Sequence, residues 1–262
     1  MDLGIGGKVA LVTASSTGLG REVALSLARE GARLSICARN EGPLKETAGQ
    51  LEEMGAEVLS KTCDLTVEKQ TAELVEKTAG HFGSIDILVT NCGGPPPGQF
   101  LDHDIDRWRE AVDLNLMSAV YLCRAAAPRM LERKWGRIVL MTSISVKQPI
   151  DGLILSNSVR AATVGLAKSM ANEFGRHGVL VNSVCPGYFK TSRVEKLAAE
   201  NAARTGGAPA DLIDKWAAST VLGRVGEPRE FGPLVAFLCS ERASYITGTA
   251  VSIDGGLCRS LL

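Results

Sequence analysis

The sequence predicts a single α/β domain in which helices cover both faces of a mostly parallel sheet. First, short apolar runs alternate with stretches of helical period along the 262 residues. Second, these runs are nearly continuous, as in strands that are buried on both faces. Third, a glycine-rich turn joins the first run to the first helical stretch. This alternation implies right-handed crossovers and a doubly wound sheet of the Rossmann type.

The apolar runs and helical periods give the expected elements. Strands are expected at residues 8–13, 33–37, 57–61, 85–90, 137–142, 179–184 and 249–253. Helices are expected at residues 18–30, 44–54, 67–81, 105–133, 156–176 and 229–240. Gly31 ends the first helix, and Pro128 is expected to bend or interrupt the long stretch 105–133.

The remaining segments are expected to lie where this architecture binds its ligands. Residues 93–98 and 186–209 are interpreted as loops at the carboxyl edge of the sheet. No linker divides the chain, so residues 1–262 form one domain, with a lid on the substrate side at about 187–221. Apolar residues recur in this lid at roughly helical spacing, which favours packing over pocket lining: Val194, Leu197, Leu212, Ile213 and Trp216.

Charge and cysteine content exclude several classes of protein. Lysine plus arginine equals aspartate plus glutamate at 29 each, which gives no electrostatic case for binding nucleic acid or an anionic membrane. The seven cysteines form no C-x-x-C pair, which indicates reduced thiols, and no metal site is predicted. Neither a signal-peptide pattern nor an apolar run of 18 residues occurs, so we expect a cytoplasmic protein.

The turn after the first strand has the chemistry of a phosphate site. It reads T-A-S-S-T-G-L-G over residues 13–20 and opens a helix. In such a turn, backbone N–H groups approach a pyrophosphate at the positive end of the helix. The alternative is an ordinary glycine-rich connection. The residues expected to bind the dinucleotide here are Ala14, Ser16, Thr17, Gly18, Leu19 and Gly20.

Motifs in the same order along residues 6–257 resemble the short-chain dehydrogenase/reductase family, in particular a divergent branch similar to 3-oxoacyl-acyl-carrier-protein reductases. Ala14 stands where that family has the first glycine of T-G-x-x-x-G-x-G. The resemblance implies dinucleotide contacts at Asp64, Leu65, Asn91, Gly93, Pro186, Gly187 and Thr191. It also implies that Asn115 and Ser143 belong to the active site.

The end of the second strand bears on which dinucleotide is bound. An acidic residue there would bind the ribose 2′-hydroxyl of NAD, whereas this sequence has Ala38 followed by Arg39 and Asn40. A guanidinium is a good partner for the 2′-phosphate of NADP. We therefore expect NADP(H) to be favoured, with NAD(H) possible; the alternative is that Arg39 is a solvated surface residue.

The resemblance also implies a catalytic tyrosine with a lysine four residues later, and this pair is absent. Ser156 occupies the tyrosine position and Arg160 the lysine position. Misalignment does not explain this, because none of the three tyrosines has a lysine four residues on: Tyr121, Tyr188 and Tyr245. An arginine keeps its proton near pH 7, so Arg160 can hold ribose hydroxyls or polarise a carbonyl but is a poor proton relay.

Three hypotheses follow from this substitution. In the first, the protein is an oxidoreductase that reduces a carbonyl, such as a 3-oxoacyl substrate, or oxidises a secondary alcohol. Ser143 and Arg160 then polarise the carbonyl, and water or another group supplies the proton. Tyr188 and Lys147 are candidates for that group, although packing or substrate lining is favoured for Tyr188. In the second, the protein binds NADP(H) but does little redox chemistry and acts as a sensor or partner. In the third, it has lost cofactor binding and serves as a structural subunit. The resemblance implies a homotetramer built on residues 105–133 and 156–176, and a small-molecule or acyl-carrier-bound substrate.

Overall fold

A computed structural model, which describes residues 2–261, confirms the α/β class. Seven parallel strands form one sheet in the order β3-β2-β1-β4-β5-β6-β7. The order reverses between β1 and β4, which places the topological switch point, and hence a ligand crevice, at their carboxyl ends. The strands are β1 Val9–Val12, β2 Arg33–Ala38, β3 Val58–Thr62, β4 Ile87–Thr90, β5 Gly136–Met141, β6 Val179–Pro186 and β7 Ala250–Ile253.

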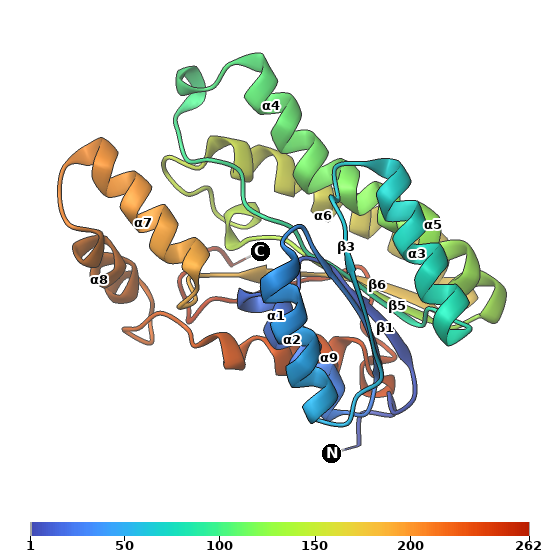
Figure 1. Ribbon diagram of the computed structural model, residues 1–262. Coiled ribbons are helices and arrows are strands. Elements are labelled where there is room, and N and C mark those ends of the chain that lie inside the picture. Colours follow the sequence, from blue (N-terminus) through green and yellow to red (C-terminus); the bar gives the residue numbers. More distant parts are fainter. Residues whose placement is uncertain (1, 262) are drawn as a thin grey trace.

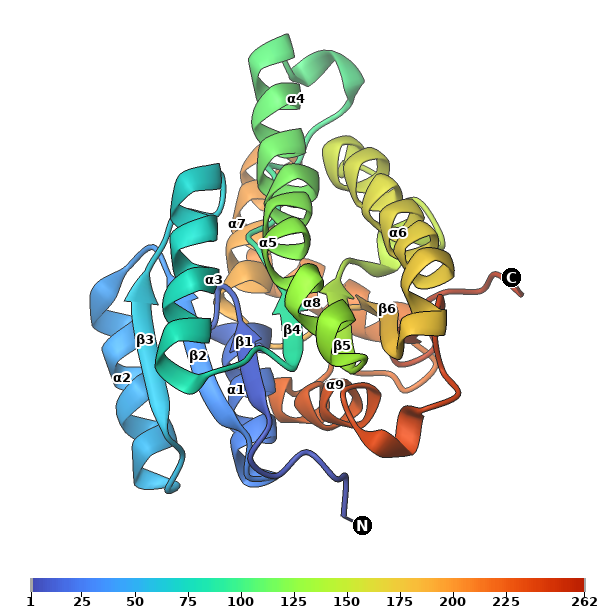
Figure 2. The same ribbon diagram turned by 90° about the vertical axis from the view of Figure 1, so that its right-hand side faces the viewer.

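Two helical layers cover the sheet (Figures 1 and 2). Helices α1 (Gly18–Arg29), α2 (Glu41–Glu53) and α9 (Gly232–Leu238) pack on one face, where Val23 and Val235 share a core with Val12 and Val89. Helices α3 (Glu68–Phe82), α5 (Ser118–Arg133) and α6 (Ile154–Phe174) pack on the other face. Alternate residues of the central strands enter different cores, which explains why these strands are apolar throughout.

The long helix expected at residues 105–133 is in fact interrupted, but not at Pro128. Helix α4 (Ile105–Val112) passes through a π-helical turn, Asp113–Met117, into α5, and Pro128 lies inside α5. The π-helical turn contains Asn115, whose carbonyl accepts a hydrogen bond from the Thr163 hydroxyl of α6 at 3.1 Å. Such turns often mark functional sites.

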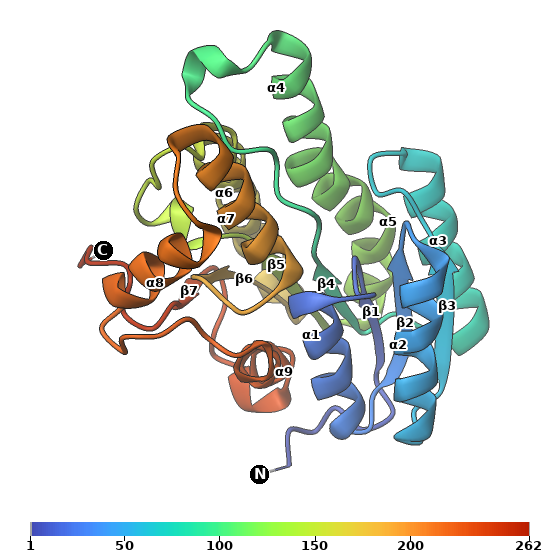
Figure 3. The same ribbon diagram turned by 60° about the vertical axis from the view of Figure 1, so that its left-hand side comes forward.

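The prediction of a loop at residues 186–209 is wrong over most of its length. Helix α7 spans Ser192–Thr205 and α8 spans Pro209–Ser219. Thr191 caps α7 by accepting from the Val194 N–H, and Pro209 occupies the first turn of α8, two start signals that turn this segment into helix. Figure 3 shows α7 and α8 beyond the carboxyl ends of the strands, where the lid was expected.

The other boundaries differ from expectation by a few residues. The expected helix 229–240 is a 3₁₀ turn, Pro228–Glu230, followed by the shorter α9. Residues 93–98 form no helix or named strand, as expected, apart from an isolated bridge between Gly98 and Leu153. Over residues 2–261, none of the helices combines the length and the hydropathy needed to span a bilayer.

The packing of α9 on α1 gives a prediction about stability. A methyl group at Gly232 would overlap the Ser26 hydroxyl and the Glu22 carbonyl oxygen. We therefore expect Gly232→Ala to lower the free energy of unfolding by about 1–3 kcal/mol in denaturant titrations. Gly49→Ala is the matched control, because Gly49 lies in α2 with open space at its Cβ position. An unfolding midpoint for Gly232→Ala at or above that of the unsubstituted chain would contradict the close approach.

Candidate functional site

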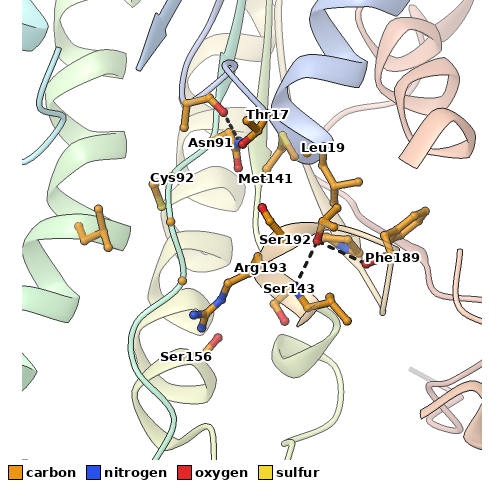
Figure 4. A pocket seen from close by; sticks show the side chains of 18 of the residues that line it. Thr17, Leu19, Asn91, Cys92, Met141, Ser143, Ser156, Phe189, Ser192 and Arg193 are labelled. Atoms are coloured by element: carbon orange, nitrogen blue, oxygen red, sulfur yellow. Dashed lines mark hydrogen bonds between the residues drawn. The ribbon is translucent and has the colours of Figure 1, made fainter. Parts of the chain in front are cut away.

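A cavity of about 390 Å³ lies at the carboxyl ends of the strands, at the switch point of the sheet. It brings together most of the residues predicted from the sequence: Ala14, Ser16, Thr17, Gly18, Leu19, Arg39, Asn40, Asp64, Leu65, Asn91, Gly93, Ser143, Ser156, Arg160, Pro186, Gly187, Tyr188 and Thr191. Gly20, Asn115 and Lys147 are not among the residues that line it. Figure 4 shows that the lining comes from the strand ends and from helices α1, α6 and α7.

The turn between β1 and α1 is built to admit an anion. Thr17 is the N-cap residue of α1, but its side chain makes no capping hydrogen bond, so the first N–H groups of the helix face the cavity without a side-chain acceptor. Ala14 adopts a φ of 46° and Gly18 a φ of 58°, both in the left-handed region. Ala14 thus fills the expected glycine position in the conformation that a glycine would adopt, although alanine is strained there.

Gly20, behind the cavity, and Asn91, in its lining, hold this turn against β4. The Asn91 amide donates to the Ala14 carbonyl at 3.1 Å, and the Thr13 hydroxyl bonds to the main chain of Asn91 at 2.7 and 2.8 Å. A Cβ atom at Gly20 would overlap the Ala14 carbonyl oxygen and lie 2.6 Å from the Asn91 amide nitrogen. Gly20 is therefore required for the close approach of helix and strand.

The far end of the cavity lies beyond β2 and β3 and has one charge of each sign. Asp64 accepts hydrogen bonds from the main chain and hydroxyl of Thr66, at 3.0 and 2.7 Å, which lowers the pKa of its carboxyl group. The exposed Arg39 guanidinium lowers it further. An adenosine ribose bound here would meet both a hydrogen-bond acceptor and a cation.

Arg160 is buried where β4 and β5 end. Its side chain is on α6, and one terminal nitrogen donates to the Thr142 and Met141 carbonyls at 3.0 and 3.3 Å. The other terminal nitrogen donates to the Gly93 carbonyl at 3.3 Å. A guanidinium carries five N–H donors in a rigid fork, so Arg160 ties two strand ends together and still presents its charge to the cavity.

Three serine hydroxyls lie beside this charge. Ser156, one helical turn before Arg160 on α6, places its Oγ 3.4 Å from the Oγ of Ser145. The Ser145 N–H donates to the Ser143 Oγ at 3.1 Å. Figure 4 shows Ser143 and Ser156 at the same end of the cavity. These hydroxyls can donate to an oxygen atom, but the site contains no phenol at the Ser156 position.

The Asn115 side chain is held by hydrogen bonds behind the cavity wall, and Tyr188 packs as the sequence favoured. The Asn115 amide donates to the Ala111 carbonyl at 3.2 Å and its oxygen lies 3.5 Å from the Cys92 thiol, so the side chain stabilises the π-helical turn behind the cavity wall. Tyr188 stacks on Trp216 of α8, with ring centroids 4.5 Å apart and planes at 6°. Burial raises the pKa of Tyr188 to about 12, which makes it a poorer proton donor than an ordinary tyrosine.

Sequence reasoning did not single out Arg193, which is the most informative addition to the lining. It lies in the first turn of α7, and its guanidinium donates to the Pro95 carbonyl at 2.7 Å across the cavity. The sequence signal for Arg193 was its charge, two positions after Thr191, which was expected to contact the dinucleotide. Val194 and Leu197, for which packing was favoured over pocket lining, also line the cavity. Other lining residues not predicted as site residues are Ala38, Cys63, Cys92, Gly94, Leu114, Met141, Thr142, Ile144, Ile150, Leu153, Phe189 and Ser192.

The sheet order, the glycine-rich turn and the cavity at the switch point define a dinucleotide-binding fold of the Rossmann type. Comparisons with known proteins agree. A family model described as Enoyl-(Acyl carrier protein) reductase matches residues 13–258. Oxidoreductase UcpA of Escherichia coli O157:H7 is 35% identical over 251 residues, which cover 95% of this chain and 94% of UcpA.

Solved structures give the same class. L-sorbose reductase from Gluconobacter frateurii, in complex with NADPH and L-sorbose, has 34% identity and a TM-score of 0.94 over 100% of both chains. The F189W form of actinorhodin polyketide ketoreductase, with NADPH, has 31% identity and a TM-score of 0.93 over 97% of this chain and 98% of that one. The chain therefore belongs to the short-chain dehydrogenase/reductase family, and its class is that of the NAD(P)-dependent oxidoreductases.

The close approach at Gly20 predicts a binding defect. We expect Gly20→Ala to weaken NADPH binding at least about tenfold, because the added methyl group displaces the turn that presents N–H groups to the pyrophosphate. Fluorescence titration with NADPH measures this. Gly80→Ala, on α3 with open space at its Cβ position, is expected to leave the dissociation constant unchanged. Equal affinities of the two variants would refute the role given to Gly20.

Proposed function

We propose that this protein uses NADP(H) to reduce a carbonyl compound or to oxidise the corresponding secondary alcohol. The observation that carries the proposal is that one cavity joins the anion-binding turn at Gly18 to the polar groups Ser143, Ser156 and Arg160. The residues present fit a nicotinamide dinucleotide, because uncapped N–H groups of α1 and the Arg39–Asp64 end lie along the same cavity. When bound, the dinucleotide supplies or accepts the hydride.

The chain itself polarises the carbonyl in this proposal. The Ser143 and Ser156 hydroxyls donate to the carbonyl oxygen, and the fixed charge of Arg160 stabilises the negative charge that develops there. Arg160 keeps its proton near pH 7, so the proton that completes the alcohol comes from water through the serine hydroxyls. The stacking of Tyr188 on Trp216 and its raised pKa support a lining role for Tyr188.

A second candidate function is dinucleotide binding without redox chemistry, as a sensor or a structural partner. The observation that favours it concerns Ser156 and Arg160, which stand at the positions of the family's tyrosine and lysine. Both side chains already form hydrogen bonds within the protein. Ser156 lies 3.4 Å from Ser145, and three main-chain carbonyls accept hydrogen bonds from Arg160. Ser156 and Arg160 can therefore stabilise the fold without reacting.

Two measurements separate these functions. Fluorescence titration with NADPH and NADH tests binding, and the change in NADPH absorbance over a panel of ketones tests hydride transfer. Saturable binding with turnover supports the oxidoreductase. Binding without turnover of any ketone or alcohol leaves the sensor, and no binding of either dinucleotide rejects both. The homotetramer and the acyl-carrier-bound substrate are further parts of the proposal; light scattering tests the first and turnover of 3-oxoacyl thioesters the second.

The preference for NADP(H) rests on Arg39. We expect Arg39→Ala to weaken NADPH binding about 10- to 100-fold and to leave NADH binding within about threefold, because charge-assisted hydrogen bonds to the 2′-phosphate are lost. Titration of both dinucleotides measures this. Arg29→Ala, an exposed arginine in the last turn of α1, is the control. An unaltered NADPH/NADH ratio would remove the argument for NADP(H).

The role of Ser156 in polarisation gives a second prediction. We expect Ser156→Ala to lower kcat about 10- to 100-fold while NADPH affinity stays the same, because one donor to the developing negative charge is removed. Ser158→Ala is the matched control, since Ser158 lies on the same helix but is exposed. A kcat for Ser156→Ala equal to that of the control would show that Ser156 is only structural.

A further inference from the structure

Among residues 2–261, the charged residues that line the cavity differ in sign between its two ends. They are Arg39, Asp64, Arg160 and Arg193. At the far end, Arg39 and Asp64 oppose each other in sign, and Arg39 lowers the pKa of Asp64. At the other end, beside Ser143 and Ser156, both charges are positive. The end at which chemistry is proposed thus has no acidic residue among those that line it.

The two guanidiniums lie close enough for their charges to interact, and neither forms an ion pair with an acid within 4.0 Å in the described residues. Arg160 is 8% exposed, and Arg193 is partly buried. Burial lowers the pKa of Arg193, and the charge of Arg160 lowers it further, as expected for like charges in one cavity. The charge of Glu200 acts against this and affects the pKa of Arg193 more than Arg160 does, although the ion pair of Glu200 is with Lys196 at 3.7 Å.

The geometry holds these guanidiniums in place for a ligand. Arg160 is fixed by the carbonyls of the β4 and β5 ends, and Arg193 reaches from α7 to the Pro95 carbonyl. Figure 4 shows the Arg193 side chain extending from α7 into the cavity, toward the end that contains Ser156. Gly94 permits this position, since a Cβ atom there would lie 2.8 Å from the Arg193 guanidinium. Each guanidinium has five N–H donors, so these bonds leave donors for a further acceptor.

We propose that Arg160 and Arg193 bind a carboxylate of the substrate, so that the carbonyl compound reduced at this site is a small oxo acid rather than a neutral ketone. This inference rests on the proposed function. Two positive charges at a low-dielectric site favour an anion, and the planar guanidinium matches the two oxygens of a carboxylate. Ile144, Ile150 and Leu197 line the same end and leave an apolar surface for a short carbon chain.

The first test compares an oxo acid with its neutral ester. The probes are 2-, 3- and 4-oxopentanoate and their methyl esters, titrated by calorimetry into the NADPH-loaded protein and assayed for NADPH consumption. We expect at least one acid to bind and react about 10- to 100-fold better than its ester, because charge-assisted hydrogen bonds are lost in the ester. Equal behaviour of every acid and its ester, or tighter binding of dihydroxyacetone phosphate than of all three acids, would overturn the carboxylate assignment.

Variants separate a role of Arg193 in binding an anion from a role in holding α7 in place through the Pro95 carbonyl. Arg193→Gln should reduce the acid-to-ester ratio of kcat/KM at least about tenfold, and Arg193→Lys should retain part of it. Arg204→Gln, on the same helix and paired with Asp102 at 3.2 Å, should leave the ratio unchanged. If Arg193→Gln weakens acid and ester equally, Arg193 only holds the lid. If it weakens NADPH binding instead, its charge serves the dinucleotide, and the proposal fails in either case.

The failure of this inference is distinguishable from failure of the proposed function. Selective binding of an oxo acid to the NADPH-loaded protein, without NADPH consumption, supports the carboxylate site and rejects the reductase. Turnover of neutral ketones with no preference for the acids supports the reductase and rejects the carboxylate site.

Discussion

A buried guanidinium must have its N–H groups satisfied, and at Arg160 this requirement shapes the whole reactive end of the cavity. The carbonyls of Thr142 and Gly93, at the ends of neighbouring strands, accept from it and are thereby fixed relative to α6. The same bonds position Ser143, which follows Thr142, and Ser156, one turn earlier on α6. A residue that replaces a titratable lysine therefore also serves as a structural clamp, which ties the fold of the site to its charge.

The turn at the opposite end of the crevice depends on a different constraint, the close approach of main chain to main chain. Gly20 has no room for a Cβ atom because the Ala14 carbonyl and the Asn91 amide lie against it. Since Asn91 follows β4 and Ala14 follows β1, this contact forms only because the two strands are neighbours at the switch point. Sheet order and dinucleotide site are thus two aspects of the same packing, and Ala14 keeps the left-handed backbone at the expense of some strain.

Much of the fold could be predicted because strands buried on both faces leave an unmistakable apolar pattern, and each of the seven lies where expected to within a few residues. The π-helical turn around Asn115 could not be predicted. It is stabilised by a contact with another helix, the hydrogen bond from Thr163 to the Asn115 carbonyl, which the sequence pattern does not reveal. Helix α7 was missed although Thr191 is a good N-cap and Val194 and Leu197 recur at helical spacing, because loops are expected at this edge of the sheet. Motif positions gave most of the cavity lining, whereas the direction of Arg193 depends on how α7 crosses the sheet edge.

The replacement of a tyrosine and lysine by Ser156 and Arg160 exchanges one physical capability for another. A lysine beside a phenol can move a proton, whereas an arginine retains its proton and offers a permanent, forked positive charge. With Arg193 at the same end, that charge is doubled, and no carboxylate of residues 2–261 neutralises it within ion-pair distance. A substrate carboxylate would offset part of this charge and also bring the substrate carbonyl to the serine hydroxyls. Binding energy from a carboxylate then does part of the work that the missing phenol would do, because it holds the carbonyl where Ser143 and Ser156 can donate to it.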